Sequence, residues 1–248
     1  MQIVHLADTH LGARPYHYQE LEEDVLRAFE EAIDYVVETR PDALLIAGDF
    51  FDKPRMSHEV IIYTLNQLRR VTGKGIPVIL AHGEHDTPGR RDRTLLELLA
   101  EAEEKVYSPR PTGSSVEEIV SKSIIRLDKG TIAVYRFNKA PIEAQRRYNQ
   151  RILPAYEAAL RAVEKPRVFL AHIGVEGPLP PDASNANVSD LPSVEYAALG
   201  HHHGRWIHRG ENQGPRLAVY TGSLYPLNIR EARSQHTRGP ILVDLSGD

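Results

Sequence analysis

The hydrophobic residues of this chain gather in short runs, each of which ends abruptly at a polar residue. Runs of this length are typical of strands buried on both faces of a sheet. The five clearest cover residues 3–7, 43–47, 76–81, 168–171 and 196–199. Between them the hydrophobic spacing becomes that of a helix, and this alternation predicts an α/β protein with crossover connections.

Three helices are expected in the first half of the chain. Apolar residues recur on one face over residues 20–39, and a helix over residues 57–71 has Ser57 as its candidate N-cap. The third is expected over residues 92–106. Ligands of such folds bind just past the carboxyl ends of the strands, which is where the polar residues stand.

The sequence pattern in the second half of the chain predicts a hairpin, a long helix, a surface loop and two closing strands. Asp128-Lys129-Gly130 supplies the hairpin turn, and the loop is rich in Pro, Ser, Asn and Asp without periodicity. The hairpin strands cover residues 123–127 and 131–137, and the long helix covers residues 142–164. The loop covers residues 176–192, and the closing strands cover residues 217–221 and 241–245. Because no repeat or interdomain linker interrupts them, we expect a single domain over residues 1–248.

The composition excludes several classes of protein. The chain has 248 residues, 41% of them hydrophobic, which is enough for one sizeable core. No apolar run approaches the roughly 18 residues that cross a bilayer, and no signal segment begins the chain, so we expect a cytoplasmic protein. The absence of cysteine means that any metal would be held by His, Asp, Glu or Asn. Few amide residues and no cysteine favour a heat-adapted, prokaryotic source.

The polar residues at the strand ends form a joint signal, although each motif alone is weak. They are Asp8-Thr9-His10, Gly48-Asp49, Gly83-Glu84-His85-Asp86, His172 and Gly200-His201-His202-His203. In extended chain, residues two apart face the same way, so Asp8 with His10, and His201 with His203, can each point at one place. Six or seven oxygen and imidazole ligands are too many for one tetrahedral zinc and suit two octahedral cations. Such a pair favours hydrolysis of a phosphoester.

These motifs resemble the calcineurin-like metallophosphoesterase superfamily, and within it the double-strand-break repair nucleases of the SbcD and meiotic-recombination-eleven type. The resemblance spans nearly the whole chain. Besides the metal motifs it rests on Leu11-Gly12, the acidic-aliphatic helix over residues 22–36, Asp52-Lys53-Pro54-Arg55, the segment from His172 to Gly177, Ala198-Leu199 before Gly200, and the segment from Thr221 to Tyr225. It implies a four-layer sandwich in which two central mixed sheets are flanked by helices.

The resemblance also implies a role for each polar residue. Asp8, His10 and His203 would hold one ion, Glu84, His172 and His201 the other, and Asp49 would bridge them. His85 would be the catalytic histidine that protonates the leaving oxygen, and Asp86 would orient its imidazole. An N-cap is the alternative role for Asp86.

Two positions depart from the usual pattern of the family. Glu84 stands where the family normally has Asn, and its extra negative charge leads to the hypothesis that Glu84 holds metal more tightly and moderates activity or shifts the metal preference. Asp52 stands where some members have a second active-site histidine, and we expect a cap or loop hydrogen bond for it.

Basic residues follow the first three motifs along the chain. Arg14, Lys53, Arg55, Arg90 and Arg91 would ring the metal site and contact the DNA backbone, although a solvated helix start is the alternative for the last two. The net charge of −4 argues against a protein that coats nucleic acid but does not exclude a nuclease. Two cations and a local arginine cluster can hold a polyanion without a basic overall balance.

The resemblance implies a metal-dependent DNA nuclease with two Mn²⁺ per chain, with Mg²⁺ as the alternative metal. It would remove nucleotides from DNA ends and cut single strands during double-strand-break repair. Family members act as homodimers with an SbcC-type ABC ATPase that carries coiled coils, and their dimer helices correspond to residues 57–70 and 92–104. Full-length members continue into a capping domain and an ATPase-binding segment that this chain does not include.

The sequence also fits two other functions. The same metal chemistry serves metallophosphoesterases that act on nucleotides, cyclic nucleotides or phosphoproteins. A weakly active or noncatalytic DNA-end-binding subunit is the second alternative, with Glu84 as its mark. A panel of substrates separates the first from the nuclease, and metal content measured together with turnover separates the second.

Overall fold

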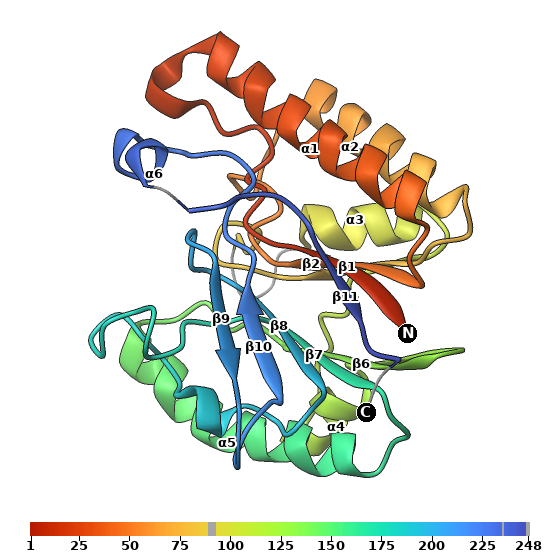
Figure 1. Ribbon diagram of the computed structural model, residues 1–248, viewed down its shortest axis with the longest axis vertical. Helices are drawn as coiled ribbons and strands as arrows, with labels where there is room; N and C mark the ends of the chain where they lie inside the picture. Colours follow the sequence, from red (N-terminus) through yellow and green to blue (C-terminus); the bar gives the residue numbers. More distant parts are fainter. Residues whose placement is uncertain (89–92, 235, 247–248) are drawn as a thin grey trace.

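Two mixed β-sheets pack face to face with helices on both outer faces (Figure 1). The structure is a computed structural model that describes residues 1–88, 93–234 and 236–246. The strand order is β11-β1-β2-β3-β4 in one sheet and β5-β6-β7-β8-β10-β9 in the other. The four-layer sandwich expected from the resemblance is confirmed.

The first sheet carries its helices on the side away from the second sheet (Figure 1). β1 to β4 run parallel, and β11 pairs antiparallel with β1. The strands are β1 (Gln2–Leu6), β2 (Ala43–Ala47), β3 (Val78–Ala81), β4 (Val106–Tyr107) and β11 (Ile241–Asp244). The covering helices are α1 (Gln19–Thr39), α2 (His58–Thr72) and α3 (Leu95–Ala102), and the 3-10 helix η1 (Pro15–His17) precedes α1.

The second sheet is covered by α4 (Val116–Ser121) and α5 (Ile142–Arg161). Its parallel centre is extended by the antiparallel strands β5 and β9 at its two edges. The strands are β5 (Ile124–Leu127), β6 (Gly130–Val134), β7 (Arg167–His172), β8 (Tyr196–Gly200), β9 (Trp206–Arg209) and β10 (Leu217–Tyr220). The short helices η2 (Val188–Asp190) and α6 (Ile229–Arg233) lie in the connections.

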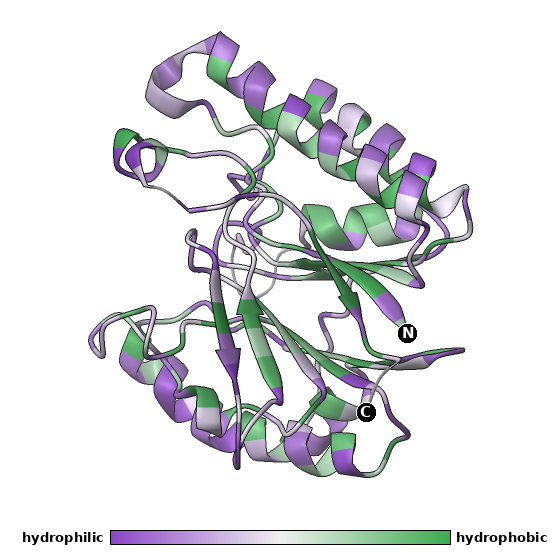
Figure 2. Cartoon of the chain, in the orientation of Figure 1, coloured by the Kyte–Doolittle hydropathy of each residue, from purple (hydrophilic) through white to green (hydrophobic). Residues whose placement is uncertain are grey.

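Each interface between layers has its own hydrophobic core. Along β2, Leu44 and Ile46 pack toward α1 and α2, whereas Ala43, Leu45 and Ala47 face the second sheet. A third core fills the space between the second sheet and α5. A strand buried on both faces needs an unbroken apolar sequence, which is why the hydrophobic runs predicted β1, β2, β3, β7 and β8. Figure 2 shows these strands as largely hydrophobic, while the helices alternate in hydropathy.

Several predicted boundaries are corrected by the structure. The helix expected over residues 92–106 is the shorter α3, because Thr94 caps it and Glu103 is extended. Val106 then pairs with Val78 as the edge strand β4. The strand expected over 131–137 ends at Val134, and α5 ends at Arg161. The short elements α4, β9 and α6 were not expected. The Ser57 cap is confirmed, since its side chain accepts from the Val60 N–H.

No helix in the described part of the chain is long and apolar enough to cross a membrane.

His5 makes the stability of this fold sensitive to acid. Its side chain is fully buried, and Nδ1 lies 2.8 Å from the Tyr196 hydroxyl. Burial lowers the pKa of His5 to about 3. Below pH 6.5 the unfolded chain therefore binds a proton that the folded chain does not, so stability falls as the pH falls. From pH 6.5 to pH 5 this histidine should cost about 2 kcal/mol of unfolding free energy.

A His5→Asn variant isolates this contribution. The asparagine can meet the Tyr196 hydroxyl but does not titrate, so the variant should lose about 2 kcal/mol less than the parent over the same pH interval. Urea unfolding at several pH values measures the difference. Parallel pH profiles for the two proteins would show that His5 is protonated in the folded state.

Candidate metal centre

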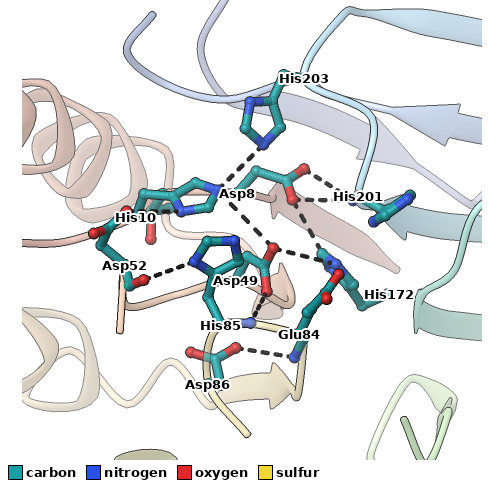
Figure 3. A network of polar contacts seen from close by, with 12 residues as sticks. Asp8, His10, Asp49, Asp52, Glu84, His85, Asp86, His172, His201 and His203 are labelled. Atoms are coloured by element: carbon teal, nitrogen blue, oxygen red, sulfur yellow. Dashed lines mark hydrogen bonds and ion pairs between the residues drawn. The ribbon is translucent and has the colours of Figure 1, made fainter. Parts of the chain in front are cut away.

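The polar strand ends meet at one edge of the sandwich, where the carboxyl ends of strands from both sheets converge (Figure 3). Contacts to backbone groups help to join the two sheets at this edge. The His201 backbone N–H donates to both carboxylate oxygens of Asp8, at 3.0 and 3.1 Å. His172 Nδ1 lies 3.0 Å from the Ala47 carbonyl oxygen, which can only accept, so Nδ1 carries the proton.

Asp8, His10 and His203 form one group whose ligand atoms all lie within 4.8 Å of one another. His10 Nε2 and His203 Nε2 face each other at 3.2 Å. His203 Nδ1 lies 3.2 Å from Glu231 Oε1, which places the proton on Nδ1 and leaves the Nε2 lone pair facing His10. Lone pairs converging beside a buried carboxylate fit a cation.

Asp8, Asp49 and His172 form a second group of the same kind. Asp49 Oδ2 lies 3.3 Å from His172 Nε2 and 4.0 Å from His10 Nε2. His172 Nε2 is buried without a hydrogen-bond partner, and its lone pair is free because Nδ1 holds the proton. Asp49 therefore lies between both groups, as a bridging ligand requires.

The charges at this edge are strongly coupled. Burial raises the pKa of Asp8. Burial also opposes ionisation of Asp49, but the facing His172 and His10 hold its pKa below the usual range. For His172 the same burial is outweighed by Asp49 and Asp8, which raise its pKa. Burial lowers the pKa of His201 to about 4, so this ring is a neutral imidazole, the form that binds metal.

The other two expected ligands lie beside these groups. The His201 ring is 5.2 Å from the His172 ring, centroid to centroid. Glu84 is exposed, and Figure 3 shows its side chain pointing toward His172. Five of the seven expected ligands thus belong to these two groups. Glu84 and His201 lie beside His172 of the second group.

His85 is exposed and lies beside the first group, with its ring centroid 4.8 Å from that of His10. Its Nδ1 lies 2.6 Å from the Asp52 backbone carbonyl oxygen and so carries the proton, which leaves Nε2 free to exchange a proton with a substrate. This bond uses the Asp52 backbone carbonyl and so is not the cap or loop hydrogen bond that was expected of the Asp52 side chain. The Asp52 carboxylate also lies 3.5 Å from His10 Nδ1.

The contacts of Asp86 correct the orienting role expected for it. Its buried carboxylate accepts from the backbone N–H groups of Phe50, Phe51 and Gly83, at 2.9–3.2 Å. Burial, with Asp49 nearby, raises its pKa to about 6. Asp86 therefore ties the loop after β2 to the loop after β3, and the Asp52 carbonyl orients His85 in its place.

The backbone at the centre is strained where its ligands stand. Asp8, His10, Asp49 and His201 have positive φ angles of 50°, 44°, 47° and 111°. Such conformations are uncommon outside glycine and cluster at functional sites. Gly83 is required for close packing, because a Cβ there would lie 2.1 Å from Asp49 Oδ1.

The structure describes three of the five basic residues that are expected to contact DNA. Arg14, Lys53 and Arg55 are exposed on the loops that follow β1 and β2. Arg14 Nε lies 3.5 Å from Glu22, and Lys53 Nζ lies 3.9 Å from Asp52. Arg90 and Arg91 lie outside the described residues.

Two further residues support this centre, and sequence reasoning did not single them out. Glu231, on α6, stands behind His203. Lys139 Nζ donates to the backbone carbonyls of Glu84 and Thr87, at 2.9 and 3.1 Å, and so holds the turn that carries His85. Glu231 does not follow a hydrophobic run, which was the signal that found the other residues, and Lys139 follows the strand expected over residues 131–137 but is not a metal-ligating residue type.

A four-layer sandwich with two histidine-carboxylate groups at one edge is the architecture of a metal-dependent phosphoesterase. The chain belongs to the calcineurin-like phosphoesterase family, whose sequence model matches residues 1–205. A crystal structure of TT1561 from Thermus thermophilus shares the fold, with a TM-score of 0.55 and 13% identity over 90% of this chain and 89% of that one.

Curated relatives carry a more specific name. The chain is 39% identical to "DNA double-strand break repair protein Mre11" of Aeropyrum pernix, over all of this chain and 58% of the relative. The protein of that name from Methanococcus maripaludis is 30% identical over all of this chain and 64% of the relative. The resemblance expected from the motifs is confirmed, and the chain spans less than two thirds of these relatives.

Proposed function

We propose that this chain is the nuclease domain of a DNA double-strand-break repair protein, which hydrolyses phosphodiester bonds at DNA ends and in single strands with two Mn²⁺ ions. The observation that carries the proposal is the pair of ligand groups that share Asp8, with Asp49 in the second group and near His10 of the first, and with His85 exposed beside them. The relatives named as DNA double-strand break repair proteins support DNA as the substrate.

We assign the ligands of each ion as the resemblance implies, and the two ligand groups support five of the seven. Asp8, His10 and His203 would hold one ion, His172, His201 and Glu84 the other, and Asp49 would contact both. The oxygen and imidazole donors suit Mn²⁺ or Mg²⁺. When bound, the two cations supply Lewis acidity, which activates a water and neutralises charge on the phosphodiester.

The protein's own groups then position the substrate and move protons. His85, protonated on both nitrogens, would donate from Nε2 to the leaving oxygen while Nδ1 stays bonded to the Asp52 carbonyl. The exposed Lys53 and Arg55 would contact neighbouring phosphates of the strand. The Asp86 carboxylate keeps the loops of Asp49 and His85 in register, because it bonds to both.

We also propose a homodimer that works with an SbcC-type ATPase carrying coiled coils. Ile62 on α2 and Leu98 on α3 are 59% and 48% exposed, so helices from the expected dimer segments carry unpaired apolar side chains. Leu65, also on α2, packs partly against the core instead.

A panel of substrates tests the proposed activity. With Mn²⁺, we expect release of nucleotides from linear DNA, and little turnover of cyclic nucleotides or phosphopeptides. Turnover confined to cyclic nucleotides would make the chain a nucleotide-directed phosphoesterase. Tightly bound metal without turnover of any substrate would make it a DNA-binding subunit.

A Glu84→Asn variant tests whether Glu84 moderates the site. Removing one negative charge beside the second ligand group should weaken Mn²⁺ binding by about 30-fold, since a unit charge about 4 Å from a divalent cation is worth about 2 kcal/mol even in water-like surroundings. Turnover at saturating Mn²⁺ should rise, because more positive charge then faces the phosphate. Calorimetric titration and DNA digestion measure the two effects, and unchanged values for both would remove the hypothesis.

A further inference from the structure

Glu231 on α6 places a carboxylate directly behind one ligand of the metal centre. Its Oε1 lies 3.2 Å from Nδ1 of His203, whose Nε2 faces His10. Glu231 lies beyond residues 1–205, which the family model matches.

The position of this carboxylate is fixed by its own hydrogen bonds. The Leu227 backbone N–H donates to Oε2 at 3.0 Å, and Asn228 Nδ2 donates to Oε1 at 2.5 Å. Asn228 also caps α6 by accepting from the Glu231 N–H. A carboxylate held this way gives the His203 ring a hydrogen-bond acceptor at a fixed position.

The helix that carries Glu231 is itself anchored to two other segments. Arg238 Nη2 donates to the Glu231 carbonyl at 3.1 Å, and its Nη1 donates to the Ser223 carbonyl. At the start of α6 the Ile229 N–H donates to the Tyr16 hydroxyl at 2.7 Å. These contacts tie the carboxylate to η1 and to the turn after β10.

The two ligand groups differ in what stands behind their histidines. Behind His203 is the Glu231 carboxylate, and the Asp52 carboxylate lies 3.5 Å from His10 Nδ1. His172 Nδ1 lies 3.0 Å from the neutral Ala47 carbonyl oxygen and 3.7 Å from Asp8 Oδ1, which belongs to a carboxylate of the ligand groups themselves. A carboxylate behind an imidazole fixes the ring and makes it a stronger ligand. Glu231 therefore supports His203 with a carboxylate that is not itself one of the expected ligands.

We propose that Glu231 is a positioning residue for the ion held by Asp8, His10 and His203, and that it acts through His203 to raise the affinity of that position alone. The inference rests on the proposed two-cation site and adds a residue to it. Loss of such an outer partner typically lowers metal affinity by about 10–100-fold.

Calorimetric titration with Mn²⁺ tests the proposal on the full chain. In wild type we expect two ions per chain. In Glu231→Gln one of the two should bind about 10–100-fold more weakly, while the other keeps its affinity. Glu20→Gln removes the same charge from an exposed position in the first turn of α1 and should leave both affinities unchanged.

A double-mutant cycle shows whether Glu231 acts through His203. In a His172→Asn background, Glu231→Gln should still weaken the remaining ion. In a His203→Asn background it should have no further effect. A role only in folding would instead lower the melting temperature of the chelator-treated protein and weaken both ions in every background.

The outcomes separate this inference from the proposed function. Two Mn²⁺ bound with equal affinity by wild type and Glu231→Gln would overturn the inference and leave the two-cation site in place. Additive effects of Glu231→Gln and His203→Asn would also overturn it. A wild-type chain that binds no Mn²⁺ would overturn both the inference and the proposed function.

Discussion

Asp49→Asn is expected to abolish hydrolysis, with a loss of at least about 10³-fold, because metal ions contribute several kcal/mol to such reactions. Asp49 Oδ2 lies 3.3 Å from His172 Nε2 and 4.0 Å from His10 Nε2, so its charge serves both ligand groups. The amide keeps the shape but loses that charge. We therefore expect metal content to fall from two ions per chain to one or none, measured by atomic emission after dialysis.

The fold should survive this change, because the Asn oxygen can still accept from the His85 N–H as Asp49 Oδ1 does at 2.8 Å. Circular dichroism and thermal unfolding of chelator-treated protein provide the control. An Asp49→Asn chain that retains two ions and normal turnover would contradict the bridging position.

His85→Asn is expected to lower the rate of DNA cleavage by about 10²–10⁴-fold while leaving both ions in place. His85 is exposed above the ligand groups, and its Nδ1 is bonded to the Asp52 carbonyl rather than aimed at either group. Its loss should therefore remove a proton donor without removing a ligand. Turnover at saturating Mn²⁺ and metal content by atomic emission measure the two quantities.

A substrate whose leaving group needs no proton tests directly whether His85 acts as a proton donor. Bis(p-nitrophenyl) phosphate releases an acidic phenol that needs no proton, so His85→Asn should slow its hydrolysis far less than that of DNA. His58→Asn, at an exposed histidine that begins α2, is the matched control and should leave both rates unchanged. Equal losses on both substrates would show that His85 positions the substrate and does not donate a proton.

Most of the centre could be predicted from the sequence, because its ligands stand where buried strands end. A central strand such as β2 must be apolar throughout, so the change to Gly48-Asp49 marks its carboxyl end and the edge at which ligands gather. The same reasoning found Asp8, His172 and the histidines after β8.

The supporting residues could not be predicted, because their roles depend on contacts between distant segments. Glu231 reaches His203 from a five-residue helix without a long hydrophobic pattern. Asp52 holds His85 through its backbone carbonyl, which no side-chain pattern reveals. The resemblance implied that Asp86 orients the His85 imidazole, whereas its carboxylate accepts hydrogen bonds from the backbone N–H groups of Phe50 and Phe51. Strand β4 was missed because Val106 continues the helical spacing of α3.

The most direct test of the central claim is release of nucleotides from linear double-stranded DNA in the presence of Mn²⁺, Mg²⁺ or a chelator. We expect digestion with Mn²⁺, none with chelator, and almost none with the Asp49→Asn chain under any condition. Digestion that continues in chelator, or that is unaffected by Asp49→Asn, would contradict a nuclease built on the two ligand groups around Asp49.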